Sequence, residues 1–169
     1  MTCVVGYFII VLVIGMYKKA YKIMDSLTPL KGDCGLLCGG ICCKGDENTG
    51  MRLFPHEEST LDIKNTECGV RLAVCNGKCD REERPLACRI FPFFPTVDEK
   101  GRVYVEKDYR AWRMCPLLSN SDEIIFDRRF FRAVKRVGKL LSKDAECLEF
   151  LRYSTEEIDR YRLLYGADE

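Results

Sequence analysis

Four cysteines within ten residues give the strongest chemical signal in the chain. The segment Cys34–Cys43 also contains three glycines, which remove side-chain volume and allow the backbone to take a positive φ. A backbone of this kind can wrap closely around a small group and present several sulfur atoms to it. We therefore expect this segment to hold a metal ion or an iron–sulfur cluster.

Further cysteines extend this candidate site. Free cysteine is often buried as a small, inert apolar residue, but a hydrophobic core does not require so many thiols in such close spacings. Four thiolates suffice for either zinc or a 4Fe–4S cluster, so the candidates can supply one site with spare thiols or two separate sites. The candidate ligands are Cys34, Cys38, Cys42, Cys43, Cys75, Cys79, Cys88 and Cys115.

The composition narrows the kind of site and its compartment. The 169 residues include 11 cysteines, an odd number that excludes a complete set of intramolecular disulfides. A chain of this length can bury a core without disulfides, so we expect reduced thiols and a cytoplasmic protein. His56 is the single histidine and is interpreted as a solvent-facing loop residue. A thiolate-dominated site selects zinc, copper(I) or iron–sulfur.

The charge balance predicts no nucleic-acid partner. Lys and Arg total 27 and Asp and Glu total 26, for a formal net charge of +1. The basic residues between Arg128 and Arg136 are interpreted as a solvated helix face, because the aromatic residues of that stretch fall on its core side.

The opening segment is apolar up to Tyr17 and is followed by Lys18, Lys19 and Lys22. Residues 4–17 can form a short membrane anchor that leaves the rest of the chain on the cytoplasmic side. Translation can instead start at Met24. A third interpretation is a helix buried against the domain or a partner. None of these affects the cysteine site.

Short strands and turns are expected to position the cysteines. Residues 51–54 and 101–106 predict strands, as does the alternation over residues 67–75. The Asn76-Gly77 pair predicts a tight turn, with Cys75 and Cys79 on either side of it.

A proline marks the next element, where Arg84-Pro85 predicts a helical turn that carries Cys88 and Arg89 and ends before Pro92. Arg89 can offset the negative charge of bound thiolates, or it can be a surface or carboxylate-paired arginine. The aromatic residues nearby are expected to form core and wall around the site; they are Phe91, Phe93 and Phe94.

Helical periodicity replaces the strand pattern in the last third of the chain. Apolar residues from Phe126 to Leu141 recur on one face and predict a helix from about Glu123 to Leu141. A short second helix is expected around Cys147, and the capping-box pattern Ser154–Glu157 predicts a third helix that Gly166 ends.

These elements predict an α+β fold. We expect residues 1–23 to be the apolar segment, residues 24–121 the cysteine-cluster part, and residues 122–169 a helical part that packs on it.

Two cysteine motifs and the segment between them form a recognisable combination. They are Cys34-x3-Cys38-x3-Cys42-Cys43, Gly50 to Pro55, and Cys75-x3-Cys79-Asp-Arg-Glu-Glu-Arg-Pro85-Leu-Ala-Cys88-Arg89-Ile-Phe-Pro92. Together they resemble the YkgJ-type cysteine-cluster family, described as a zinc- or iron-chelating domain. The resemblance covers about Leu30 to Leu117 and implies cysteine-held metal. A more distant similarity is to flagellin lysine-N-methylase-like proteins, which are described as iron–sulfur proteins. The three-residue spacing at both gaps of the first group leaves its ligand set open.

Three functions follow from these observations. We expect a metal-binding protein that holds zinc or an iron–sulfur cluster in a structural, storage or sensing role. The first alternative is an iron–sulfur enzyme or electron carrier, including one related to protein methylation, although no acid–base or nucleophile constellation is evident. The second is a thiol–disulfide redox protein that uses Cys42-Cys43, or Cys75 with Cys79.

Overall fold

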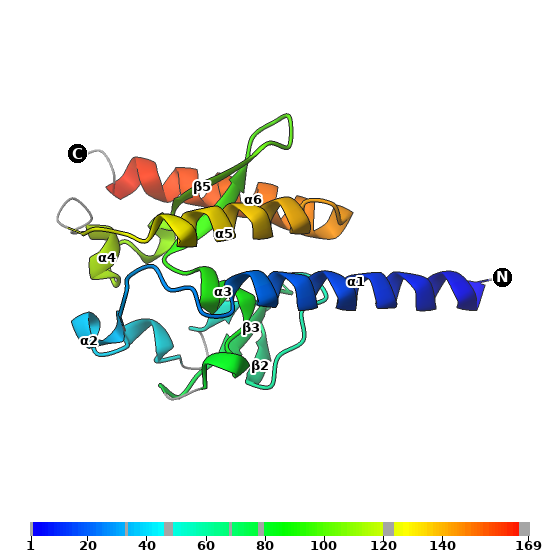
Figure 1. The fold of residues 1–169 in the computed structure, drawn as a ribbon, viewed down its shortest axis with the longest axis horizontal. Coiled ribbons are helices and arrows are strands. Elements are labelled where there is room, and N and C mark those ends of the chain that lie inside the picture. The colour runs from blue at the N-terminus through cyan, green and yellow to red at the C-terminus, as the bar shows by residue number, and fades with distance from the viewer. Residues whose placement is uncertain are drawn as a thin grey trace.

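The fold mixes helices with two small sheets, which confirms the α+β class and the helical C-terminal part. A computed structural model describes residues 2–32, 34–45, 49–67, 69–77, 80–119 and 124–165, with side chains from residue 13 onward. Figure 1 shows the long N-terminal helix running between the C-terminal helices and the small sheet that contains β2 and β3.

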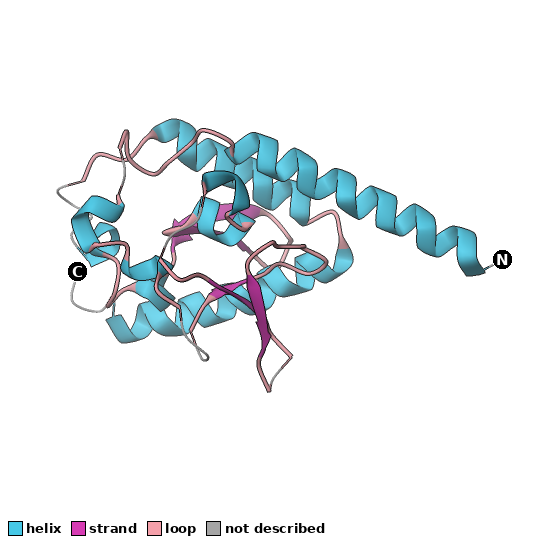
Figure 2. Cartoon of the chain, turned by 90° about the horizontal axis from the view of Figure 1, so that it is seen from below, coloured by secondary structure: helices cyan, strands magenta, loops and turns pink. Residues whose placement is uncertain are grey.

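Short helices and strands follow α1 along the chain, and two longer helices end it (Figure 2). The helices are α1 (Thr2–Met24), α2 (Gly35–Cys38), α3 (Leu86–Ile90), α4 (Pro116–Ser119), α5 (Arg128–Leu141) and α6 (Ala145–Tyr165). The short 3-10 turns are η1 (Ile41–Cys43), η2 (Arg81–Glu83) and η3 (Tyr109–Ala111). The strands are β1 (Met51–Arg52), β2 (Asp62–Asn65), β3 (Arg71–Val74), β4 (Phe93–Val97) and β5 (Val103–Lys107).

Both sheets are antiparallel, and one of them has the order β1-β3-β2. Strands β1 and β3 lie within predicted strand regions, and β5 overlaps the third region and ends one residue beyond it. Strands β2 and β4 were not predicted. The sequence of β2 is polar and its side chains are mostly exposed, so it carries no apolar alternation. In β4, Pro95 interrupts the pattern, but it lies opposite Val105 in a two-stranded sheet, where a missing N–H is tolerated.

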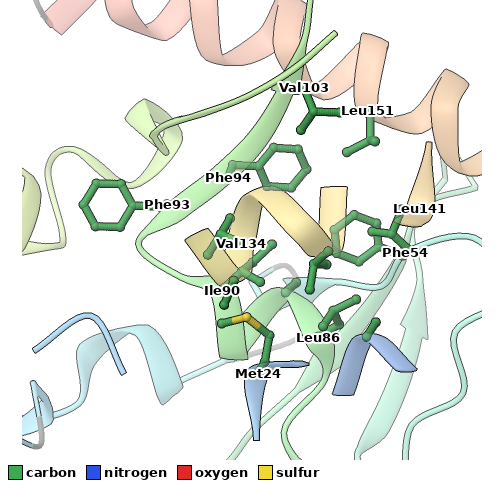
Figure 3. Close-up of a cluster of buried hydrophobic side chains, with 14 of the residues drawn as sticks. Met24, Phe54, Leu86, Ile90, Phe93, Phe94, Val103, Val134, Leu141 and Leu151 are labelled. Atoms are coloured by element: carbon green, nitrogen blue, oxygen red, sulfur yellow. The ribbon is translucent and has the colours of Figure 1, made fainter. Parts of the chain in front are cut away.

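The hydrophobic core joins the two ends of the chain. Figure 3 shows Met24 of α1, Ile90 of α3 and Val134 of α5 in one cluster, with Leu151 of α6 on the far side of it. On α1 the buried side chains are spaced at helical intervals, so the last turns of this helix are part of the core; they are Tyr17, Ala20 and Met24. Within the described residues, no helix has the length and the apolar content needed to cross a membrane.

Two predictions about the C-terminal helices were wrong, one on where a helix begins and one on the number of helices. Helix α5 begins at Arg128 rather than at Glu123, because the Asp127 side chain caps it by accepting a hydrogen bond from the Arg129 amide at 2.8 Å. The residues after Cys147 form one helix, α6, instead of two.

The capping-box pattern lies inside α6. Ser154 is fully buried there, and its neighbour Thr155 donates to the Leu151 carbonyl at 2.7 Å and accepts from the Val97 amide at 3.1 Å. Glu157, the expected partner of the Ser154 amide, instead pairs with Arg52 and Arg110. The residues of the capping-box pattern therefore make tertiary contacts inside α6 and do not begin a helix.

A buried carboxylate fastens α1 to the rest of the fold. Glu57 has no exposed surface, and it accepts hydrogen bonds from the Tyr21 hydroxyl at 2.5 Å, the Leu86 amide at 2.6 Å and the Phe54 amide at 3.0 Å. Burial raises the pKa of Glu57, and these three donors oppose the rise. The Tyr17 hydroxyl adds a hydrogen bond to the Pro55 carbonyl at 2.5 Å.

Replacing this carboxylate tests its structural weight. We expect Glu57→Ala to lower the free energy of unfolding by about 2–4 kcal/mol, because three buried donors lose their acceptor. The adjacent Glu58→Ala is the matched control, since the Glu58 side chain is 90% exposed, and it should change stability by less than about 0.5 kcal/mol. Denaturant unfolding of both variants measures the difference, and equal effects would contradict the role assigned to Glu57.

A close contact sets the distance between α5 and the β4–β5 hairpin. A Cβ atom at Gly138 would lie 2.5 Å from the Pro95 Cβ and 2.7 Å from the Val103 Cγ1. The hairpin can pack this closely on α5 only because position 138 has no side chain.

This contact reverses the usual effect of glycine in a helix. Alanine ordinarily stabilises a helix interior by about 1 kcal/mol relative to glycine, but overpacking costs about 1–3 kcal/mol. We therefore expect Gly138→Ala to lower the midpoint of thermal unfolding. Gly15→Ala in α1 is the control, because nothing lies within 4 Å of its added Cβ, and it should leave the midpoint unchanged or raise it. A stabilised Gly138→Ala variant would show that the contact yields without strain.

Candidate metal centre

The first cysteine group forms two short helical turns with a glycine pair between them. Gly39 and Gly40 have φ angles of 61° and 66°, in the left-handed region that favours glycine. The Gly40 amide donates to the Gly35 carbonyl at 3.1 Å, which closes the turn of α2. The glycines thus reverse the chain between Cys38 and Cys42.

Four thiols from two distant segments line one small pocket: Cys34, Cys38 and Cys42 of the first group, and Cys115. The cavity between them has a volume of about 10 Å³, which is close to the space that one water molecule needs. The pocket is therefore narrow in this conformation. Its remaining walls are apolar and come from Ile41, Phe91, Met114, Pro116 and Leu117.

Cys115 is the buried member of this set. Burial, with smaller contributions from the nearby Cys34 and Cys38, raises the pKa of the Cys115 thiol to about 11. The backbone amides of Leu117 and Leu118 act in the opposite direction and lower this pKa. Such amides stabilise a thiolate once a cation offsets its charge, as backbone donors do around metal-bound sulfur.

Cys42 shows that the thiols of this region interfere with one another's ionisation. Its pKa is raised by the sulfur contact with Cys43 at 4.0 Å, by burial, and by the proximity of Cys43, Cys38 and Cys34. A second negative charge close to the first is unfavourable, so Cys42 stays protonated in the absence of a cation. A divalent cation in the pocket would reverse this preference.

A shared pocket is not yet a coordination sphere. Across the parts of the chain that the structure describes, no three Cys, His, Asp or Glu side chains are arranged to hold a metal ion. Thiol sulfurs move between staggered rotamers about the Cα–Cβ bond. The pocket lining therefore shows which cysteines lie around one space. Coordination of a metal by all four sulfurs would require their side chains to rotate.

The second cysteine group lies beside the end of the first. The Gly45 amide donates to the Cys75 carbonyl at 3.0 Å, and Lys44 pairs with Asn76 in an antiparallel bridge. These contacts place the end of β3 next to the chain that leaves Cys43. Cys79 lies outside the described residues, so the tight turn predicted between Cys75 and Cys79 is not described.

Cys88 and Arg89 lie on α3, as predicted, and Cys88 is not in the pocket lining. Arg89 is buried and donates to the Arg84 carbonyl at 2.9 Å and the Glu82 carbonyl at 2.7 Å. Its guanidinium lies 4.6 Å from the centre of the Tyr21 ring. Arg89 thus orders the loop that precedes Cys88, a role that neither sequence interpretation included.

Arg81 ties the same loop to the end of α1. It donates to the Asp25 carbonyl at 2.7 Å and the Met24 carbonyl at 3.2 Å, and it also bonds the Leu27 carbonyl. These carbonyls lack partners within the helix, and a guanidinium satisfies several at once. No local sequence signal identifies this contact, because the two partners are more than fifty residues apart.

His56 and Met114 differ in their relation to the pocket. His56 is exposed, with its Nε2 atom 3.2 Å from the Glu146 Oε2 atom, and it is not in the pocket lining. Met114, which was not predicted, also lines the pocket beside the thiols. Its position next to Cys115 in the chain was the available signal.

Comparison with known proteins adds no relative to this picture. No family model matches the chain, and neither the curated proteins nor the solved structures yield a match. The resemblance to the YkgJ-type family therefore rests on the cysteine motifs alone.

Proposed function

We propose that this chain is a metal-binding protein that holds one thiophilic metal ion through Cys34, Cys38, Cys42 and Cys115. The observation that supports this most directly is the convergence of these thiols, from two distant segments, on one small pocket. Four soft ligands are the number that closed structural metal sites use.

The four thiols of the pocket match the ligand number of a single closed zinc site. A 4Fe–4S cluster also takes four thiolates, and metal analysis distinguishes the two. Zinc accepts four thiolates in tetrahedral geometry, and the apolar walls would exclude water from the ion. We therefore propose zinc, in a structural, storage or sensing role.

The electrostatics support the same proposal. Four thiolates on a divalent zinc ion leave a net negative charge that nearby donors must stabilise. The backbone amides of Leu117 and Leu118 already lower the pKa of the Cys115 thiol and so favour its thiolate. Reduced thiols of this kind persist in a reducing compartment, so we place the protein in the cytoplasm.

Metal content is the first test. Protein purified without oxygen should contain about one zinc per chain and be colourless. Cys34→Ser and Cys115→Ser should each reduce the bound zinc to well below half of that, because closed sites depend on every ligand. Cys147→Ala is the control and should keep its zinc, since Cys147 is buried against Tyr17 and is not in the pocket lining.

The other outcomes of this measurement are equally informative. Iron with acid-labile sulfide and an absorbance at about 400 nm would identify the bound group as a cluster and favour the iron–sulfur alternative. Metal that survives both serine substitutions would move the site to the second cysteine group. Absence of any metal from the anaerobic protein would overturn the proposal.

The pH dependence of metal affinity follows from the raised thiol pKa values. Because the Cys115 thiol has a pKa of about 11 and the Cys42 pKa is also raised, both carry protons at neutral pH before metal binds. Zinc must displace these protons, so its apparent affinity should rise with pH from 6 to 8 by at least about tenfold per unit and fall in acid. Chelator competition measures this, and pH-independent affinity would argue against thiolate ligands.

A further inference from the structure

The helices α1 and α5 run antiparallel beside each other. At one end the Asp127 amide donates to the Pro29 carbonyl at 2.9 Å, and at the other the Tyr17 hydroxyl lies 3.6 Å from the Cys147 sulfur. The C-terminal end of α5 therefore lies where α1 leaves the body of the protein. Beyond this point the N-terminal half of α1 projects away from the remaining elements (Figures 1 and 2).

Exposed basic residues lie on both helices near this end and on the turn that follows α5. Neither helix contains an acidic residue. Two acidic residues follow Lys143 in the chain: Asp144 accepts a hydrogen bond from the Cys147 amide at 2.9 Å, and Glu146 lies 3.2 Å from His56. We call this surface the basic end; its residues are Lys18, Lys19, Lys22, Arg136, Lys139 and Lys143, and no ion pair between described residues involves them.

The helix that projects from the basic end is apolar in sequence. The chain carries no charged residue from Thr2 to Tyr17, and its positive charges begin at Lys18. An apolar helix next to a group of lysines and arginines matches the two layers of an anionic lipid surface, with acyl chains below and charged headgroups above. A nucleic acid would complement the charge but not the apolar helix.

We propose that the basic end docks on anionic lipid headgroups while the apolar half of α1 enters the outer part of the acyl layer. The near-neutral net charge of the whole chain does not oppose this, because headgroup attraction depends on local charge within a Debye length. The antiparallel pairing supplies basic residues from two helices to one contact. Docking is independent of the metal centre, which lies on other elements of the fold.

Vesicle sedimentation of the full-length chain tests this directly. The protein should bind vesicles of phosphatidylcholine with phosphatidylserine more tightly than vesicles of phosphatidylcholine alone, and added salt should weaken the binding. The triple variant Arg136→Gln, Lys139→Gln, Lys143→Gln should lower the partition coefficient by roughly ten- to a hundredfold. The same charge change at exposed positions elsewhere, Lys31→Gln, Lys100→Gln, Arg160→Gln, is the matched control and should leave binding nearly unchanged.

Further measurements keep the test decisive if one variant misfolds. Circular dichroism reports folding, and Lys18→Gln, Lys19→Gln, Lys22→Gln removes charge from the other helix of the same surface. Failure to bind anionic vesicles, or equal binding to both vesicle types, would overturn the proposal. Tight binding of a double-stranded oligonucleotide that the triple variant abolishes, without preference for anionic vesicles, would assign the surface to nucleic acid instead.

Discussion

The buried carboxylate of Glu57 connects three elements that come from separate parts of the chain. Its hydrogen bonds reach Tyr21 on α1, the Phe54 amide after β1 and the Leu86 amide at the start of α3. Helix α3 leads directly into Phe91, which forms a wall of the thiol pocket. The geometry of the candidate centre therefore depends on a polar contact that lies outside it, and burial makes that contact costly to lose.

The thiol pocket combines local and long-range causes. Positive φ angles at Gly39 and Gly40 reverse the chain within the first cysteine group, which is a local property of glycine. Cys115 joins the group only because the segment after η3 packs against the same wall. Once assembled, the neighbouring thiols help to raise the pKa of Cys42 and Cys115, which makes these two groups unfavourable as thiolates. Under the proposed function, a bound cation would offset this cost.

Local charge and net charge differ in this protein. A formal charge of +1 hides the asymmetry between acid-free α1 and α5 and the acidic residues elsewhere. Two helices far apart in the chain contribute to one basic surface because they pack antiparallel on a shared core. Such a surface is a property of tertiary structure, since each helix alone presents only an ordinary solvated face.

The sequence by itself determined the features that depend on local spacing. The crowded cysteines, the amphipathic face of α5, strand β5 and the proline-led turn of α3 follow from residues within one or two turns of each other. Tertiary structure decided the rest. It buried Ser154 inside a continuous α6, placed Pro95 in a strand, and chose Cys115 as the fourth thiol of the pocket. Each of these features depends on contacts between residues far apart in the chain. The free energy gained by burying side chains in those contacts exceeds what a single turn or helix cap contributes.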